Sequence, residues 1–214
     1  MITLHGNSIS PYVRKVLAVL NLKNLAFKQI QQMPFSADDE FKKISPLGKI
    51  PALQDGDASI CDSRVICEYL DEAYPQSSVY PSDPKDKAHA RWIEELCGNQ
   101  LTEQAAGIFF QRFMRPMVLK QETDEELVEK IINKRLPPLL DYMETQVPAA
   151  GFLFGADIGV ADISVVTPFI NAGYADYQVD SARWPQLANF MTRVKDHPVM
   201  AELLHTEAVI MGRG

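Results

Sequence analysis

The 214-residue sequence has few cysteines and histidines and no long apolar run. Its three cysteines, Cys61, Cys67 and Cys97, form neither a Cys-x-x-Cys pair nor a zinc-binding spacing, and its four histidines are scattered, so we expect no metal site. A sparse, odd set of cysteines fits buried, reduced thiols in the cytoplasm. No stretch approaches the ~18 apolar residues that cross a bilayer. The N-terminus lacks a basic segment followed by an apolar one, so we expect no secretory signal.

Positive charge is also in short supply, because 21 lysines and arginines face 28 aspartates and glutamates, for a net charge of −7. Nucleic acids and anionic membranes repel an acidic surface, so we expect neither as a partner. This net charge still permits a local basic pocket for a small anion. Hydrophobic residues make up 46% and charged residues 23% of the chain, which is typical of a folded globular protein.

The first 75 residues alternate strand and helix signals. Ser10 and Pro11 suit the cap and first position of a helix, and Asp62 and Ser63 begin another. The turn sequence Asp-Gly-Asp at 55–57 separates two short apolar runs and predicts a hairpin. The predicted order is β-α-β-α-β-β-α, an α/β domain. The strands are expected at 2–5, 25–31, 52–54 and 58–61, with a short helix at 38–44.

A change of composition follows, and the rest of the chain reads as helical. Residues 76–85 are rich in serine and proline and predict a linker, so the domains are expected at 1–75 and 86–214. Pro137 and Pro138 interrupt one helical pattern, and we expect a kink or break at Leu136. The predicted helices of this all-α bundle cover 85–115, 124–146, 160–173, 184–196 and 198–206.

The strongest local motif surrounds Pro51, which stands directly before a predicted strand. A proline cannot donate to a strand ladder and is expected at an edge or a strand start. In a thioredoxin-like domain such a proline is cis, and the N–H and C=O of the preceding residue, Ile50, then face solvent. These groups could bind the backbone of an extended peptide. A plain trans-proline turn is the alternative interpretation.

Two segments resemble the cytosolic glutathione transferases. Residues 45–53 read SPLGKIPAL and residues 62–70 read DSRVICEYL. The family pattern is Asn-Pro-x-Gly-Lys-Val-Pro-x-Leu followed by Glu/Asp-Ser-x-x-Ile-x-x-Tyr-Leu. Length, linker and the helical second domain match as well. The resemblance implies a thioredoxin-like N-terminal domain, an all-helical C-terminal domain and glutathione as co-substrate.

The resemblance also implies a glutathione half-site at Lys49, Ile50, Pro51, Asp62 and Ser63. Helix N–H groups and the Ser63 hydroxyl suit the γ-glutamyl carboxylate, and Asp62 suits its ammonium. Lys49 suits the glycyl carboxylate or the γ-glutamyl carbonyl. As alternatives, Lys49 is a solvated surface lysine and the Asp62–Ser63 pair is an ordinary helix cap.

The thiol of glutathione should meet the start of the first helix. Thioredoxins carry Cys-x-x-Cys there, whereas this chain reads Ser10-Pro11-Tyr12-Val13, which excludes disulfide exchange at this site. A serine hydroxyl and a helix N-terminus would both favour the thiolate of glutathione, whose thiol resembles cysteine with a pKa of about 8.5. Ser10 is the first candidate, Ser8 the second and the Tyr12 hydroxyl the third. Ser10 could instead be an N-cap alone.

The helical domain supplies weaker signals. Phe109 and Phe113, with Tyr12, are candidates for a pocket that holds a hydrophobic electrophile, although an aromatic stripe at helical spacing is commonly core. Asp162 matches a capping box in which Gly159 replaces the usual serine or threonine, and this motif is a folding device.

The resulting hypothesis is a glutathione transferase that adds glutathione to a small hydrophobic electrophile, with a role in detoxification. A glutathione-dependent isomerase, dehalogenase or peroxidase fits the same residues. So does a non-catalytic binding or regulatory protein of this fold, although the retained half-site argues against it. The resemblance further implies a cytoplasmic homodimer.

Overall fold

The computed structural model describes residues 1–35 and 38–212, which form two compact units. The first unit contains Met1–Tyr80 together with helix α10 (Pro198–Ile210), and the second contains Pro81–His197. The sequence boundaries assign α10 to the helical domain. In the structure α10 packs on helix α1 of the first unit, through residues nearly two hundred positions apart that sequence periodicity cannot pair. In the described part of the chain no helix is long and apolar enough to cross a bilayer.

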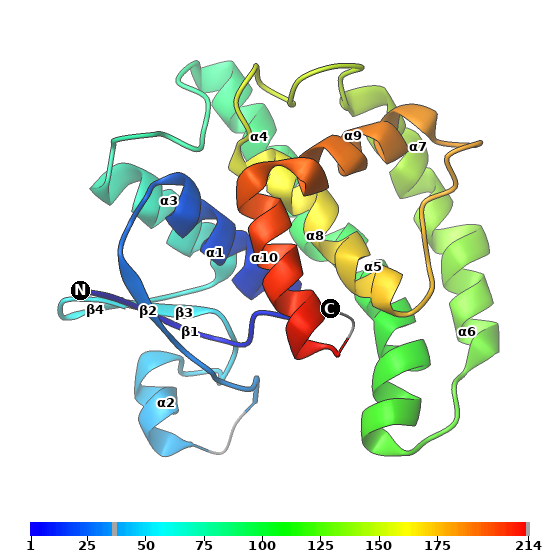
Figure 1. Ribbon diagram of the computed structural model, residues 1–214, viewed down its shortest axis with the longest axis horizontal. Helices are drawn as coiled ribbons and strands as arrows, with labels where there is room; N and C mark the ends of the chain where they lie inside the picture. Colours follow the sequence, from blue (N-terminus) through cyan, green and yellow to red (C-terminus); the bar gives the residue numbers. More distant parts are fainter. Residues whose placement is uncertain (36–37, 213–214) are drawn as a thin grey trace. The chain divides into compact units, whose positions relative to one another are not determined.

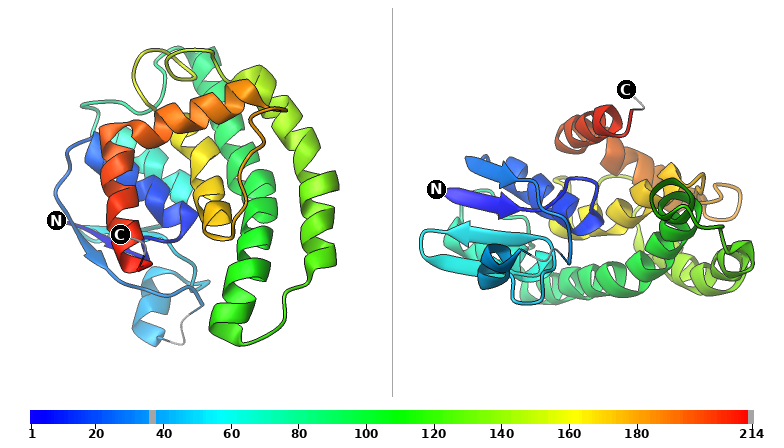
Figure 2. Two further views of the ribbon diagram at one scale, coloured as in Figure 1. Left: turned by 45° about the vertical axis from the view of Figure 1, so that its right-hand side comes forward. Right: turned by 90° about the horizontal axis from the view of Figure 1, so that it is seen from below.

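The first unit is built on a sheet with the strand order β2-β1-β3-β4. The parallel pairing of β1 with β2 and the antiparallel pairing of β1 with β3 and of β3 with β4 give the mixed sheet of a thioredoxin-like domain. Helices α1 and α3 cover one side of the sheet and α2 the other (Figures 1 and 2). The predicted α/β order is confirmed. The elements are β1 (Ile2–His5), α1 (Pro11–Leu22), β2 (Phe27–Ile30), α2 (Asp39–Ile44), β3 (Ala52–Asp55), β4 (Ala58–Cys61) and α3 (Ser63–Ala73).

Helix α1 is the buried centre of this unit. Every residue from Val13 to Leu20 is buried, and Pro11 occupies the first turn, where its missing N–H costs nothing. At the other end the buried Lys23 ammonium pairs with Asp71 of α3 at 3.2 Å and donates to two carbonyls in the segment after α3. This ion pair fixes the C-terminal end of α1.

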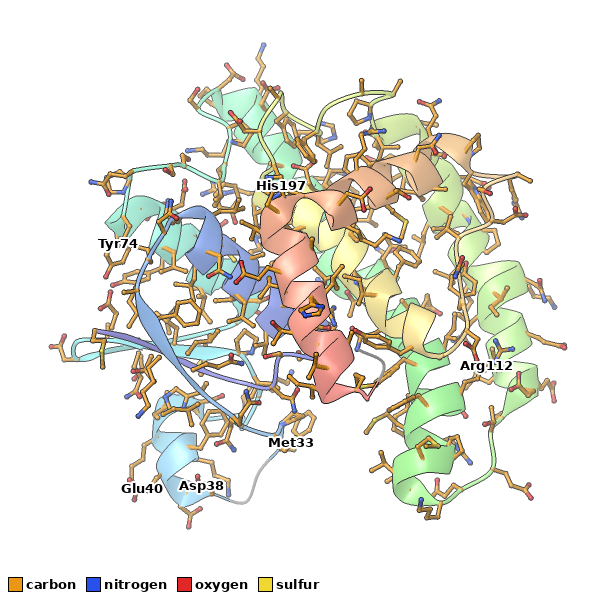
Figure 3. The ribbon with its side chains drawn as sticks, in the orientation of Figure 1. Met33, Asp38, Glu40, Tyr74, Arg112 and His197 are labelled. Carbon is orange, nitrogen blue, oxygen red and sulfur yellow. The ribbon has the colours of Figure 1, made fainter. Side chains whose placement is uncertain are left out.

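The end of α3 is tied to the β3–β4 hairpin by an aspartate. The hydroxyls of Tyr69 and Tyr74 both donate to the carboxylate of Asp55 (Tyr74 is labelled in Figure 3). The hydrogen bond to this anion raises the pKa of Tyr74 to about 12, with help from burial. The hairpin turn itself contains Gly56 in the left-handed region, at φ +61°.

The second unit is helical, as the sequence predicts, and α8 is its core. Every residue of α8 from Val160 to Ala172 is buried, and Figure 2 shows α4 and α5 running beside α8 (yellow). The elements are α4 (Pro84–Leu96), η1 (Cys97–Leu101), α5 (Thr102–Phe109), η2 (Phe110–Leu119), α6 (Glu125–Lys130), η3 (Ile131–Arg135), α7 (Leu136–Gln146), α8 (Val160–Tyr174) and α9 (Pro185–Asp196).

The elements η1, η2 and η3 are π-helical stretches that join α-helices end to end. The sequence predicts one continuous helix over 85–115, which includes η1, and a kink or break only at Leu136, directly after η3. Pro137 and Pro138 stand in the first turn of α7, which begins at Leu136 directly after η3, so the expected break coincides with a change of helix type. Arg112 of η2 forms a two-pronged ion pair with Glu125 of α6, which connects the two neighbouring helical stretches (Figure 3).

The capping box predicted at the start of α8 is present. The Asp162 carboxylate accepts the N–H of Gly159 at 2.7 Å and the N–H of Leu153 at 2.8 Å. Burial raises the pKa of this carboxyl to about 6, although the backbone hydrogen bonds oppose the shift. Gly159 has no side chain to contribute, so the side-chain half of this cap comes from Asp162, which ties the preceding loop to the helix.

Candidate glutathione site

The register of the sheet brings three loops together at one end of the first unit. His5, at the end of β1, pairs with Ala52 at the start of β3, and Ala52 pairs with Cys61 at the end of β4. Because β1 and β4 both run antiparallel to β3, the segments that continue past this end lie side by side. They are residues 6–10, residues 49–51 and residues 62–63, which include the predicted polar site residues Ser8, Ser10, Lys49, Asp62 and Ser63.

The two candidate serines differ in what they contact. Ser10 is the N-cap of α1 and half-buried, and its Oγ accepts the N–H of Val13 at 3.5 Å. A hydroxyl that accepts one bond still has its own proton to donate. Ser8 is buried, and its Oγ accepts a hydrogen bond from Gln29 of β2 at 3.0 Å. Gln29 therefore holds Ser8 against the sheet, whereas Ser10 stands at the positive end of the α1 dipole.

A side chain that the sequence reading left out shapes the loop between these serines. Asn7 Oδ1 accepts the N–H of Ile9 at 3.0 Å, and the Asn7 carbonyl accepts the N–H of Ser10 at 3.0 Å. Its amide also lies 3.7 Å from the Met33 sulfur, on the loop after β2 (Figure 3). Asn7 thus folds residues 7–10 into a turn that presents Ser10. The tendency of asparagine to bond the backbone two residues on is the sequence signal.

The loop before β3 presents the backbone of Ile50. The Ile50–Pro51 bond is cis, as predicted. Within residues 1–35 and 38–212, neither the N–H nor the C=O of Ile50 has a hydrogen-bond partner, so both groups can bind a ligand backbone. Lys49 next to it is exposed.

Ser45 holds this loop in place. Its Oγ donates to the Lys49 carbonyl at 2.8 Å, and its own carbonyl accepts the N–H of Gly48 at 2.8 Å. Gly48 lies at φ +62°, where a side chain would be strained. The sequence marks Ser45 only as the position where the family pattern has asparagine. Its role in anchoring Lys49 became visible in the structure.

Asp62 and Ser63 occupy the N-terminus of α3. Asp62 has φ +73°, which is unusual for a residue other than glycine, and its Oδ1 accepts the N–H groups of Arg64 and Val65. Strained backbone of this kind gathers at ligand sites. Ser63 is buried, and its hydroxyl has no hydrogen-bond partner among the residues that the structure describes. A hydroxyl at the start of a helix that the protein leaves without a partner suits a carboxylate ligand.

The three residues predicted to line the electrophile pocket do not share a unit, since Tyr12 belongs to the first unit and the two phenylalanines to the second. Tyr12 lies in the first turn of α1 and is 37% exposed. Phe109 and Phe113 stack on each other at 4.9 Å between ring centroids, one turn apart on the α5–η2 helix. Their shared role stays a prediction.

Known families and structures match both units. The family model described as glutathione S-transferase, N-terminal domain, matches residues 4–78, and that described as glutathione S-transferase, C-terminal domain, matches residues 109–207. A probable glutathione S-transferase of Oryza sativa subsp. japonica is 30% identical over 200 residues, covering 91% of this chain and 92% of the relative.

Solved structures agree on the fold. A glutathione S-transferase from Rhodospirillum rubrum F11 superposes with a TM-score of 0.83 at 23% identity, covering 95% of this chain and 92% of that chain. A glutathione S-transferase-I bound with lactoylglutathione gives a TM-score of 0.82 at 22% identity, covering 94% and 97%. The family models and the rice relative, together with the residues gathered at the end of the sheet, assign this chain to the glutathione S-transferase family.

Proposed function

We propose that this protein is a glutathione transferase in which Ser10 stabilises the thiolate of bound glutathione for attack on a small hydrophobic electrophile. The observation that carries the proposal is the convergence of three loops at one end of the sheet. Within the described residues they supply unpaired backbone groups at Ile50, a hydroxyl without a protein partner at Ser63 and a helix-capping hydroxyl at Ser10.

Each part of glutathione has a chemical partner in this arrangement. The γ-glutamyl carboxylate binds the Ser63 hydroxyl and the N-terminus of α3, and Asp62 Oδ2 faces its ammonium, since both capping bonds of Asp62 use Oδ1. The backbone of Ile50, ahead of Pro51, pairs with the cysteinyl residue as a strand would. Lys49 attracts the glycyl carboxylate.

Ser10 then contributes to chemistry by donating its hydroxyl proton to the sulfur. The thiolate is the nucleophile, so a donor that favours it raises the reactive fraction at neutral pH. The α1 dipole acts in the same direction. The protein forms no covalent bond, and glutathione attacks the electrophile directly.

The test is the ionisation of bound glutathione, followed by thiolate absorbance as the pH is varied. A hydrogen bond to a charged group contributes roughly 1.5–3 kcal/mol, so Ser10→Ala should raise the pKa of the bound thiol by about 1 to 2. Ser8→Ala is the matched control and should leave it nearly unchanged. An unshifted pKa in Ser10→Ala, or a shift only in Ser8→Ala, would refute the assignment of Ser10.

A panel of electrophiles separates transfer from the related reactions. We propose transfer to aromatic or alkyl electrophiles in the cytoplasm by a homodimer, with Tyr12, Phe109 and Phe113 contacting the second substrate. Conjugate formation supports this. Rearrangement of the substrate without consumption of glutathione would indicate an isomerase instead. Formation of glutathione disulfide from a peroxide would indicate a peroxidase. Release of halide without a stable conjugate would indicate a dehalogenase. Glutathione binding without any turnover would make the protein a binding module.

A further inference from the structure

The last helix of the chain carries a buried charge. Helix α10 is largely exposed, yet Glu207, close to its end, is only 1% exposed. Its carboxylate forms a two-pronged ion pair with Arg14 of α1, with Nε to Oε1 and Nη2 to Oε2 both at 2.6 Å. The Arg14 side chain is fully buried as well.

The same guanidinium reaches the loop that presents Ser10. Arg14 Nη2 donates to the carbonyl of Ile9 at 3.2 Å, and Ile9 directly precedes Ser10. The hydrogen bond from the Val13 N–H to Ser10 Oγ, which ties the Ser10 side chain to the helix, is long at 3.5 Å. A cap of this length holds the hydroxyl weakly. The position of Ser10 therefore depends on the backbone of the turn, which the hydrogen bonds of Asn7 and the contact of Arg14 with the Ile9 carbonyl hold together.

A buried ion pair of this kind is poorly explained by stability alone. The desolvation of two charges opposes folding, and well-packed apolar residues often stabilise a protein as well as a buried ion pair or better. Removal of one partner has a different effect, since it leaves the other charge buried and free to reorient. If Glu207 is removed, the group free to reorient is the Arg14 guanidinium, which also donates to the Ile9 carbonyl.

We propose that Glu207 is a positioning residue for the glutathione thiol, which acts by fixing Arg14 and, through the Ile9 carbonyl, the Ser10 hydroxyl. The proposal rests on the function assigned above to Ser10. It makes α10 a part of the thiol site although no atom of this helix needs to touch glutathione. In this arrangement the C-terminal helix of the chain tunes the ionisation of the substrate.

Glu207→Gln tests the proposal, with Asp71→Asn as a matched control. Asp71 pairs with buried Lys23, the cap residue at the opposite end of α1, so each variant removes a carboxylate charge that pairs with a cation at one end of this helix. Both should lower the melting temperature. Only Glu207→Gln should raise the pKa of the bound thiol and lower kcat, about tenfold for a small misplacement of a catalytic group, with little change in KM.

A second readout needs no activity. Amide hydrogen exchange in the ligand-free protein should quicken at residues 9–13 in Glu207→Gln but not in Asp71→Asn. Should Glu207→Gln fail to fold, Arg14→Lys serves in its place, because it keeps the charge and lacks the guanidinium fork.

The outcomes separate the two proposals. If Ser10→Ala shifts the thiol pKa and Glu207→Gln leaves both the pKa and the exchange of residues 9–13 as in the wild type, the positioning role is refuted and the function stands. If Ser10→Ala has no effect on the thiol pKa, the assigned function of Ser10 fails, whatever Glu207 does. Equal effects of Glu207→Gln and Asp71→Asn would reduce Glu207 to a structural residue.

Discussion

At the N-terminus of α3, Asp62 caps the helix, and Ser63 offers a hydroxyl to a ligand. Asp62 accepts the N–H groups of Arg64 and Val65 with one carboxylate oxygen, and so caps the helix from within the protein. Ser63 is buried without forming such a bond to the described chain. The Ser63 hydroxyl therefore keeps its hydrogen-bonding capacity for a ligand, and in the free protein only water competes for it.

Ser63→Ala should therefore weaken glutathione binding while leaving the stability of the unliganded protein nearly unchanged, because the hydroxyl forms no hydrogen bond to the described chain. The loss of a hydrogen bond to a carboxylate corresponds to a roughly 10- to 100-fold higher Kd. Calorimetric titration with glutathione measures it. Ser59→Ala, an exposed serine on neighbouring β4, is the control and should bind normally. Unchanged affinity in Ser63→Ala would remove Ser63 from the site.

The residues that sequence reading found share a local signal, and those it missed do not. Ser10 precedes a proline at a helix start, and Lys49, Asp62 and Ser63 stand inside a spaced motif. Ser45 and Asn7 act through hydrogen bonds to nearby backbone, for which the residue type gives a hint but the geometry decides. Glu207 could not be predicted, because 193 residues separate it from Arg14.

Asp162 holds the start of α8, the element on which the helical unit is packed. Its carboxyl is buried, so the neutral form is favoured and the pKa rises to about 6. In the unfolded chain an aspartate has a pKa of about 3.9. Between these two values the native state binds the proton more tightly than the unfolded state does. Stability contributed by this group is thus present at acid pH and lost as the pH rises from about 4 to about 6.

Asp162→Asn should destabilise the protein, and by more at pH 4.5 than at pH 7. The pKa difference corresponds to a change of about 3 kcal/mol at most, which is several degrees in melting temperature for a chain of this size. Melting temperatures of both proteins between pH 4.5 and 7 provide the measurement. The other titratable groups are the same in both proteins, so the difference between the two melting temperatures at each pH reports on Asp162.

Asp157→Asn, on the exposed loop before α8, is the control and should shift melting little at every pH. A destabilisation by Asp162→Asn that stays constant over this range would show that its carboxyl is ionised throughout.

The helix types of the second unit lay outside what the sequence can predict. Apolar periodicity predicts helix through residues 85–115 and 124–146, and the chain is indeed helical there. The π-helical stretches η1, η2 and η3 interrupt these helices without a signal in the apolar periodicity. Pro137 and Pro138 fall in the first turn of α7, directly after η3, where the hydrogen-bond pattern of the helix changes and these two positions have no N–H to supply.

At the scale of the molecule, the proposed glutathione site depends on one register. A shift of β3 by one residue against β1 would turn its side chains to the opposite face and separate Ile50 from the end of β1. Sequence could predict the order of elements, because each has its own start and stop signals. It could not predict which residues face each other across the sheet, and that pairing builds the site.

Since the proposed glutathione half-site lies within the first unit, binding should stabilise that unit selectively. At a glutathione concentration of 100 Kd the native state gains about 2.7 kcal/mol, a roughly hundredfold slowing of exchange for amides that open with the site. We expect this slowing at residues 7–14, 49–53 and 62–66, followed by hydrogen-exchange mass spectrometry. Peptides from α8 should exchange as before. Equal protection of α8 would mean that the two units open as one, and protection of α8 alone would place the binding site in the helical unit and contradict the half-site.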